Sequence, residues 1–277
     1  MTSASLRIMK TDLNHRRLAG DWVRGVNRLR GLLGAIFPGL ERAFDYAKRS
    51  PLVLLTAFTT PEEIRAAGEP GLIAHLHEHG THRPDTAGIA AGALEAAQAQ
   101  AIVLASQDST AALIKRLAAK LLELDRERKE LDKTIASVFR SNPHAQIIES
   151  LPGMGPILGA EFIVVTGGDV AAFAHSGKLA SYAGLAPVAK DSGRVSGNLR
   201  RPKRYNRRVR RVFSMDALSS IAAHGPSRTF YQRKRGERMR HTQALPALAR
   251  RLVDVLWALL RDGRFFEHNA PVRPTTT

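Results

Sequence analysis

One long apolar repeat, between residues 109 and 140, constrains the fold of this chain more than any other feature. Its apolar residues recur at alternating spacings of three and four, which places them along one side of an α-helix. Asp108 and Ser109 can cap the start of this helix, and Ser141-Asn142-Pro143 ends it. The positions along the repeat are Ile114, Leu117, Leu121, Leu124, Leu131, Ile135 and Val138, with Arg128 as a polar interruption.

Two interpretations of this helix stay open at the level of sequence. The apolar seam could pair in an antiparallel coiled coil with an earlier helix over about residues 18–37, or join two copies of the chain. Alternatively, one long helix packs on its own domain. We favour a coiled coil that supports a homo-oligomer, because a polar residue such as Arg128 suits the setting of register better than a globular core.

The rest of the chain also predicts a mainly α fold. Thr60-Pro61-Glu62-Glu63 has the pattern of a capping box with proline at the first helical position. Helices with one apolar face are expected over about residues 206–223 and 241–260, whereas the apolar run 51–58 fits a helix or a strand equally well. The expected domains are a helical coiled-coil region for multimerisation (1–143), a second helical domain (144–268) and a disordered tail (269–277).

The second domain opens with a glycine-containing turn, L-P-G-M-G-P at residues 151–156. A helix over about residues 157–166 is expected to follow. The pattern looks like the turn of a helix-hairpin-helix, in which Gly153 and Gly155 let backbone N–H groups approach a phosphate at the positive end of the next helix. The alternative is a tight turn between helices that touches no ligand.

The stretch from Leu185 to Arg211 combines turn residues with a high density of positive charge. D-S-G at 191–193 and S-G-N at 196–198 are turn sequences, and no Asp or Glu follows Asp191 in the stretch. Guanidinium groups pair with phosphate oxygens and stabilise the charge that develops when a phosphate is attacked. The candidate phosphate ligands are Arg194, Arg200, Arg201, Lys203, Arg204, Arg207, Arg208 and Arg211. Because like charges at helical spacing repel, an anion is expected near the last of these.

Composition favours a polyanionic partner. Lys and Arg number 42 against 25 Asp and Glu, a formal charge of +17, which attracts nucleic acid. A membrane surface is the rival partner, but there is no apolar run long enough to span and no lipidation motif. The absence of cysteine excludes disulfides and thiol catalysis, and residues 1–10 lack the apolar core of a signal peptide. These features predict a cytoplasmic protein that binds nucleic acid and no membrane.

Four histidines at positions 75, 77, 79 and 82 raise the question of a metal site. On a helix, only His75 and His79 could share an ion, because positions two apart face different ways. No Glu stands in the zincin spacing and no further ligand is obvious. We therefore expect a solvated helix end and no metal site.

Several runs of residues in the second domain resemble one family of proteins. They are S-L-P-G-M-G-P (150–156), L-A-S-Y-A-G-L-A-P (179–187), D-S-G-R-V-S-G-N-L-R-R-P (191–202), R-R-V-F (210–213), F-Y-Q-R-K-R (from 230) and R-L-V-D-V-L-W-A-L-L-R-D-G (from 251). With these runs, residues 147–267 resemble the C-terminal domain of the IS110/IS116/IS902 transposases, the DEDD or bridge-RNA-guided recombinases of insertion sequences.

The resemblance implies a bacterial enzyme that cuts and rejoins DNA. In the family a serine attacks the scissile phosphate and forms a phosphoseryl link, and the matching residue is Ser192, which precedes a glycine after the G-L-x-P stretch. The resemblance also implies a guide RNA that pairs with target and donor DNA, and multimers held partly by the coiled coil. The arginines would then hold nucleic-acid backbones and leave sequence choice to the RNA.

One departure from the family affects this expectation. The family begins with a ribonuclease-H-like domain whose four acidic residues bind Mg²⁺, and we expect that domain to be missing here. Asp12 is similar to the start of the last acidic motif, D-x-x-D, but position 15 is His and a helix starts too soon after it. We therefore expect no cofactor in this chain itself. The alternative to a transposase is an inactive remnant that binds DNA or RNA and dimerises.

Overall fold

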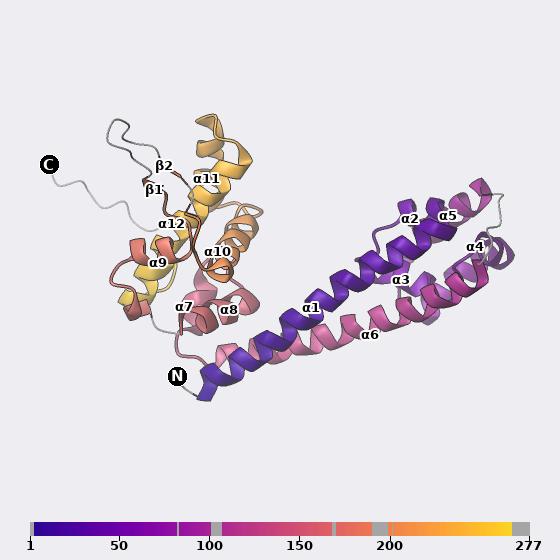
Figure 1. The fold of residues 1–277 in the computed structure, drawn as a ribbon, viewed down its shortest axis with the longest axis horizontal. Coiled ribbons are helices and arrows are strands. Elements are labelled where there is room, and N and C mark those ends of the chain that lie inside the picture. The colour runs from indigo at the N-terminus through magenta and orange to yellow at the C-terminus, as the bar shows by residue number, and fades with distance from the viewer. Residues whose placement is uncertain are drawn as a thin grey trace. The chain divides into compact units, whose positions relative to one another are not determined.

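The computed structural model of the protein confirms the mainly α prediction (Figure 1). It describes residues 3–81, 83–100, 107–167, 170–189, 199–200 and 202–267, so the expected tail, 269–277, lies outside the described residues. The elements are α1 (Ser3–Ile36), α2 (Pro38–Ala43), α3 (Arg49–Leu54), α4 (Pro61–Glu78), α5 (Arg83–Ala99), α6 (Gln107–Arg140), α7 (Ala145–Ser150), α8 (Pro156–Thr166), the 3₁₀-helix η1 (Val170–Ala172), α9 (Ser176–Tyr182), β1 (Val188–Ala189), β2 (Leu199–Arg200), α10 (Arg207–Ser220), α11 (Pro226–Gly236) and α12 (His241–Asp262).

The chain divides into two compact units. One comprises residues 14–131, and the other comprises residues 1–13 together with 132–277. Helices α1 and α6 contribute to both units, because the division falls inside each of them. The boundary expected from sequence, at residue 143, follows the end of α6.

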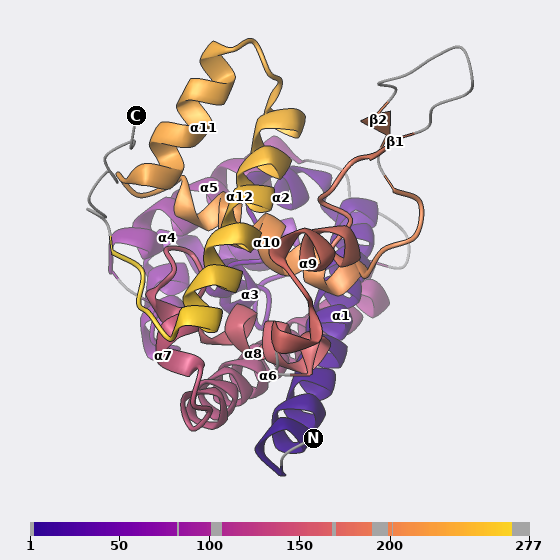
Figure 2. The same ribbon diagram turned by 90° about the vertical axis from the view of Figure 1, so that its left-hand side faces the viewer.

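In the unit of residues 14–131, helices α1 and α6 run antiparallel (Figures 1 and 2). Gly25 allows their close approach, because a Cβ atom at this position would lie 2.7 Å from Leu121 Cδ2. Arg128, the polar residue of the predicted seam, lies 5.3 Å from the centre of the Trp22 ring and pairs with Asp125 at 3.0 Å. Arg128 thus has partners within its own chain, and the coiled-coil contact between copies stays a prediction.

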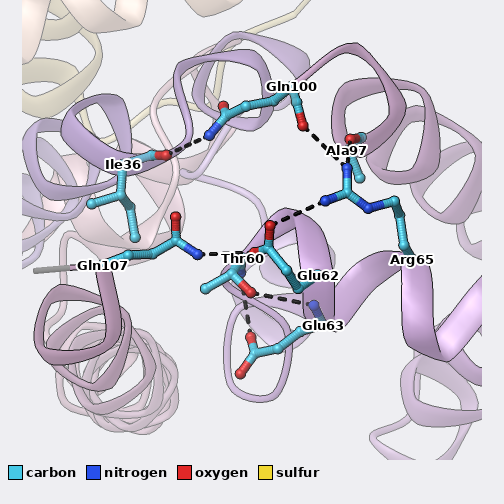
Figure 3. A network of polar contacts seen from close by, with 8 residues as sticks. All are labelled: Ile36, Thr60, Glu62, Glu63, Arg65, Ala97, Gln100 and Gln107. Atoms are coloured by element: carbon cyan, nitrogen blue, oxygen red, sulfur yellow. Dashed lines mark hydrogen bonds and ion pairs between the residues drawn. The ribbon is translucent and has the colours of Figure 1, made fainter. Parts of the chain in front are cut away.

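The predicted capping box at the start of α4 is confirmed. Thr60 Oγ1 accepts a hydrogen bond from the Glu63 backbone N–H at 3.2 Å, and Glu63 Oε2 accepts one from the Thr60 N–H at 3.3 Å. Figure 3 shows that the same turn holds the start of α6, because Gln107 donates to Glu62 at 2.9 Å. The ambiguous apolar run after residue 50 forms α3 and a following turn.

A second part of this polar network joins three helix ends (Figure 3). Arg65 donates to the carbonyl oxygens of Ala97 at 2.6 Å and Gln100 at 3.1 Å. The Gln100 side chain in turn donates to the carbonyl of Ile36 at 2.8 Å. The ends of α1 and α5 are therefore fixed to α4 by hydrogen bonds that satisfy backbone carbonyls left open at helix termini.

The unit of residues 1–13 and 132–277 is built around α8, α10 and α12. Helix α10 packs on both α8 and α12, and α9 and α11 pack on α12. The rings of Phe162 and Phe213 meet edge to face at 5.9 Å between α8 and α10. Trp257 is half-buried and donates its indole N–H to the carbonyl of Phe173 at 3.3 Å. In the part of the chain that the structure describes, no helix has the length and apolar character needed to cross a bilayer.

Candidate nucleic-acid interface

The segment that carries the candidate nucleophile is closed by a short strand pair. Strands β1 and β2 are antiparallel, with Val188 opposite Arg200 and Ala189 opposite Leu199. Residues 190–198, which include Ser192 and Arg194, lie outside the described residues, as does Arg201. The strand pair therefore brings the two ends of the Ser192 segment together. The remaining predicted phosphate ligands begin with Arg200 in β2 and continue along the chain from there.

Four basic residues after this segment are exposed: Arg200, Lys203, Arg204 and Arg207. We call them the exposed cations. None of their side chains makes a hydrogen bond or an ion pair with another described residue. Because a bound phosphate would not have to displace a protein carboxylate from them, these side chains are the best-placed candidates among the predicted phosphate ligands that the structure describes.

Helix α10, which begins with Arg207, is held at its start by Asn206. The Asn206 Oδ1 atom accepts hydrogen bonds from the backbone N–H groups of Arg208 at 2.9 Å and Val209 at 3.2 Å. The backbone and side-chain amides of Asn206 donate to the carbonyl and hydroxyl oxygens of Tyr182, each at 2.7 Å. This cap fixes the start of α10 to the end of α9. It therefore determines the position of Arg207, the first residue of α10.

Two other predicted phosphate ligands, Arg208 and Arg211, have carboxylate partners inside the protein. Arg211 forms an ion pair with Glu161, and Arg208 Nε lies 3.5 Å from the same carboxylate. Arg208 Nη2 also lies 2.5 Å from Asp12 Oδ2. Glu161 and Asp12 are buried, with 2% and 5% exposure, and supply the anion that the sequence predicts near this helix. The role of Arg208 and Arg211 toward phosphate stays a prediction, in competition with these partners.

The two glycines of the predicted phosphate turn have different surroundings. Gly153 has φ of +97°, and a Cβ atom there would lie 2.5 Å from the Asp216 carbonyl oxygen, so glycine permits the close contact of this turn with α10. Gly155 is exposed and precedes α8 without a capping side chain, and a Cβ atom there would meet nothing within 4 Å. Of the two glycines, Gly155 is the one whose surroundings leave room for a ligand. The phosphate role of both glycines stays a prediction.

Asp216 lies fully buried beneath the Gly153 turn. Neither of its carboxyl oxygens has a hydrogen-bond partner among the described residues. Burial raises the pKa of Asp216 from 3.8 to about 8. The carboxyl is therefore mainly protonated and neutral at pH 7, which avoids an unpaired charge beside the turn.

Helix α11 carries a second basic segment, residues 228–235, in which some cations have partners close by in the chain. Arg233 and Lys234 lie 5.2 and 5.8 Å from the centre of the Phe230 ring. Both also pair with Glu237, at 3.8 and 2.7 Å. A groove of about 840 Å³ between α11 and α12 is lined by Phe230, Arg233 and Arg251, among others. Arg233 and Lys234 thus have partners within the protein, unlike the exposed cations.

The sequence prediction missed three acidic residues that organise this region: Asp12, Glu161 and Asp216. Glu161 is the one charged residue in the otherwise apolar α8, which is a usable signal of a buried charge with a partner. Asp216 stands three residues after Phe213 on the buried stripe of α10, a similar signal. Asp12 gives no such signal, because its partner is 196 residues away.

The chain is similar to a known family of proteins. Residues 145–232 match the model of the Transposase IS116/IS110/IS902 family. The chain is 50% identical over 264 residues to the insertion element IS116 uncharacterized 44.8 kDa protein of Streptomyces clavuligerus, across 95% of this chain and 65% of that protein. It is 48% identical over 261 residues to the insertion element IS900 uncharacterized 42 kDa protein of Mycobacterium paratuberculosis, across 94% and 63%.

A third relative is more distant. The insertion element IS110 uncharacterized 43.6 kDa protein of Streptomyces coelicolor is 33% identical over 260 residues, across 92% of this chain and 62% of that protein. The chain therefore spans just under two thirds of the length of each of these relatives. From these similarities, residues 145–232 carry the domain of the IS116/IS110/IS902 transposase family, and the chain is similar to insertion-element proteins over most of its length.

Proposed function

We propose that the chain acts on DNA as an insertion-sequence transposase that cuts and exchanges strands through Ser192. The observation that carries this proposal is the group of exposed cations. The first of them, Arg200, lies in β2, the strand that directly follows the Ser192 segment. Other arginines nearby have partners in the protein, whereas these four face solvent. A strand held by them would place its backbone next to the Ser192 segment.

The proposed step is a transesterification at phosphorus. A bond forms between the Ser192 hydroxyl oxygen and the scissile phosphorus, while the ester bond between that phosphorus and one sugar oxygen breaks. The serine proton leaves to a base, and the released sugar oxygen takes up a proton. The exposed cations stabilise the negative charge on the phosphate oxygens and hold the strand in place. The resulting phosphoseryl link conserves the ester for rejoining to a second strand.

The proposal includes a guide RNA, which pairs with both DNA partners while the protein holds backbones. It also includes a homo-oligomer formed through α1 and α6. The family resemblance implies Mg²⁺ in an acidic domain. Among the described residues, the group that could hold a metal ion is His75, Glu78 and His79. This group is rich in nitrogen, whereas Mg²⁺ requires oxygen ligands, so it does not fit Mg²⁺ and no step is assigned to that ion here.

We expect a covalent protein–DNA adduct when the protein is incubated with element-end DNA, the element RNA and Mg²⁺. The adduct should survive denaturing electrophoresis and disappear in Ser192→Ala. Ser196→Ala is the matched control and should keep the adduct. Ser196 lies four residues after Ser192 and, like Ser192, directly precedes a glycine. An adduct that persists in Ser192→Ala would contradict the assignment of the nucleophile.

The second candidate function is a catalytically inactive protein that binds DNA or RNA. It is favoured by the exposed cations alone, which can hold a phosphate backbone without any catalytic step. Its expected result in the same experiment is binding to element DNA and RNA with no covalent product in any variant. That outcome would remove the enzymatic proposal and leave the exposed cations as a binding surface only.

A further inference from the structure

The C-terminal end of α4 assembles three side chains that can bind a metal ion. His75, Glu78 and His79 stand at positions i, i+3 and i+4, which share one face of a helix. One nitrogen from each imidazole and one carboxylate oxygen of Glu78 all lie within 4.8 Å of one another. The sequence pattern identified only the histidine pair, because Glu78 stands outside the zincin spacing. His82, the last histidine of this region, lies outside the described residues.

The hydrogen bonds of His75 determine which of its ring nitrogens is free to bind a metal. His75 Nε2 lies 3.1 Å from the Val53 carbonyl oxygen and 3.2 Å from Thr56 Oγ1. The carbonyl can only accept, and Thr56 already donates its hydroxyl hydrogen to the same carbonyl at 2.7 Å. His75 Nε2 must therefore carry the hydrogen, and in the neutral ring Nδ1 has the free lone pair.

The same reasoning gives the opposite tautomer for His79. His79 Nδ1 lies 2.9 Å from the carbonyl oxygen of His75, which can only accept a hydrogen bond. Nδ1 thus carries the hydrogen, and Nε2 has the lone pair. Imidazoles that bind metals have this arrangement, with one nitrogen donating to a backbone carbonyl and the other coordinating the ion. His75 and His79 thus both already have their outer partners in place.

The geometry of the two rings and of the helix also suits a cation. The ring centres of His75 and His79 are 4.3 Å apart, and Phe58 contacts the His75 ring edge to face at 5.3 Å. His75 is half-buried and positioned by these contacts, while Glu78 and His79 are exposed and can rotate onto an ion. The end of α4 presents its carbonyl groups, which favours positive charge. Arg49 donates to the His79 carbonyl at 3.1 Å, and its positive charge opposes the binding of a cation.

We propose that His75, Glu78 and His79 form a binding site for a divalent transition-metal ion, with Zn²⁺ as the best fit. Two imidazole nitrogens and one carboxylate oxygen are a ligand set that zinc accepts, and water would fill the remaining position. The site lies in the unit of residues 14–131 and does not depend on the proposed nucleic-acid function. A bound ion would link Glu78 and His79 to His75, which itself contacts the Val53 carbonyl at the end of α3.

The proposal is tested on the tag-free full chain after removal of metal with a chelator and of nucleic acid. Equilibrium dialysis against Zn²⁺ should show one ion per chain, and Co²⁺ should give the visible absorption bands of a nitrogen- and oxygen-ligated ion. His79→Ala and Glu78→Gln should each weaken binding by about tenfold or more. His77→Ala is the matched control, since His77 faces another way and contacts Thr86 at 3.3 Å, and it should bind as the wild type does.

Two results would overturn the proposed site. One is a wild-type Kd for Zn²⁺ of ~100 µM or weaker, which would show that the three side chains do not act together. The other is an equal loss of binding in His77→Ala and His79→Ala, which would indicate non-specific binding to surface histidines. Thermal unfolding with and without Zn²⁺ gives a second measurement, in which the wild type should gain stability and His79→Ala should not.

Discussion

Replacement of Asp216 by asparagine should make the protein more stable than the wild type above pH 7 and should remove one part of its pH dependence. The Asp216 carboxyl is buried without a hydrogen-bond partner among the described residues, and its pKa is raised from 3.8 to about 8. An asparagine side chain has nearly the same shape as the carboxyl but cannot ionise. To fold at neutral pH, the wild type must either bury the charged carboxylate or take up a proton that the unfolded chain lacks, and both cost free energy. The asparagine variant has neither cost.

The sign follows from proton linkage. Between pH 4 and pH 8 the folded protein keeps a proton on Asp216 that the unfolded chain has lost, so the free energy of unfolding falls as pH rises. The contribution is complete below the unfolded pKa and is lost by about pH 8. The slope is at most about 1.4 kcal/mol per pH unit, and structural relaxation reduces the total to roughly 2–5 kcal/mol.

Urea unfolding at several pH values from about 5 to about 9 measures this effect as the difference between variant and wild type. The difference should grow with pH and level off once the pH exceeds the folded-state pKa of about 8. Asp254→Asn is the control, because Asp254 lies on α12 in an ion pair with Arg250, and it should leave the slope unchanged. Parallel profiles for Asp216→Asn and the wild type would show that Asp216 is solvated or paired.

Gly153→Ala should lower the free energy of unfolding by about 3 kcal/mol or more. A non-glycine residue with φ of +97° is strained, at a cost of roughly 1–3 kcal/mol. The added Cβ atom would also lie 2.5 Å from the Asp216 carbonyl oxygen and 3.1 Å from the Ser220 backbone nitrogen. These are backbone atoms of α10, so the turn or the helix must shift to relieve the contact.

Gly155→Ala provides a control within the same turn. Gly155 has an ordinary negative φ of −74°, and no atom lies within 4 Å of the position that an added methyl group would take. Chemical denaturation of both variants should therefore show a change below about 1 kcal/mol for Gly155→Ala. Equal destabilisation by the two substitutions would contradict the packing of Gly153 on α10.

The sequence predicted those parts of the fold that local patterns determine. The helices near residues 109–140, 206–223 and 241–260 have apolar residues at helical spacing, and the Thr60 capping box is a local hydrogen-bond pattern. The run after residue 50 was ambiguous, because a short apolar segment has too few positions to separate a period of two from one of 3.6. Packing of the unit decides that it is helical.

The sequence could not predict which basic residues have partners within the protein. Arg207 and Arg208 are neighbours with the same chemistry, yet Arg207 is exposed while Arg208 pairs with Asp12 and Glu161. That difference depends on contacts between residues far apart in the chain, and no local pattern encodes it. The composition predicted a nucleic-acid partner, and among the described residues the fold shows which basic side chains have partners within the protein.

The central claim is that the exposed cations hold the nucleic-acid backbone, and the salt dependence of binding tests it most directly. Affinity for element-end DNA would be measured over a range of salt concentrations for the wild type and for two variants that each lose four charges. The first replaces the exposed cations with glutamine. The second replaces four exposed basic residues of the other unit, Arg28, Arg42, Arg116 and Lys120.

The first variant should bind more weakly at every salt concentration. Its slope of log affinity against log salt should be shallower by about 0.9 for each phosphate that the variant no longer neutralises. The second variant should keep nearly the wild-type slope. Equal changes in the two variants would mean that binding follows overall charge, and that the surface beside the Ser192 segment is not the interface.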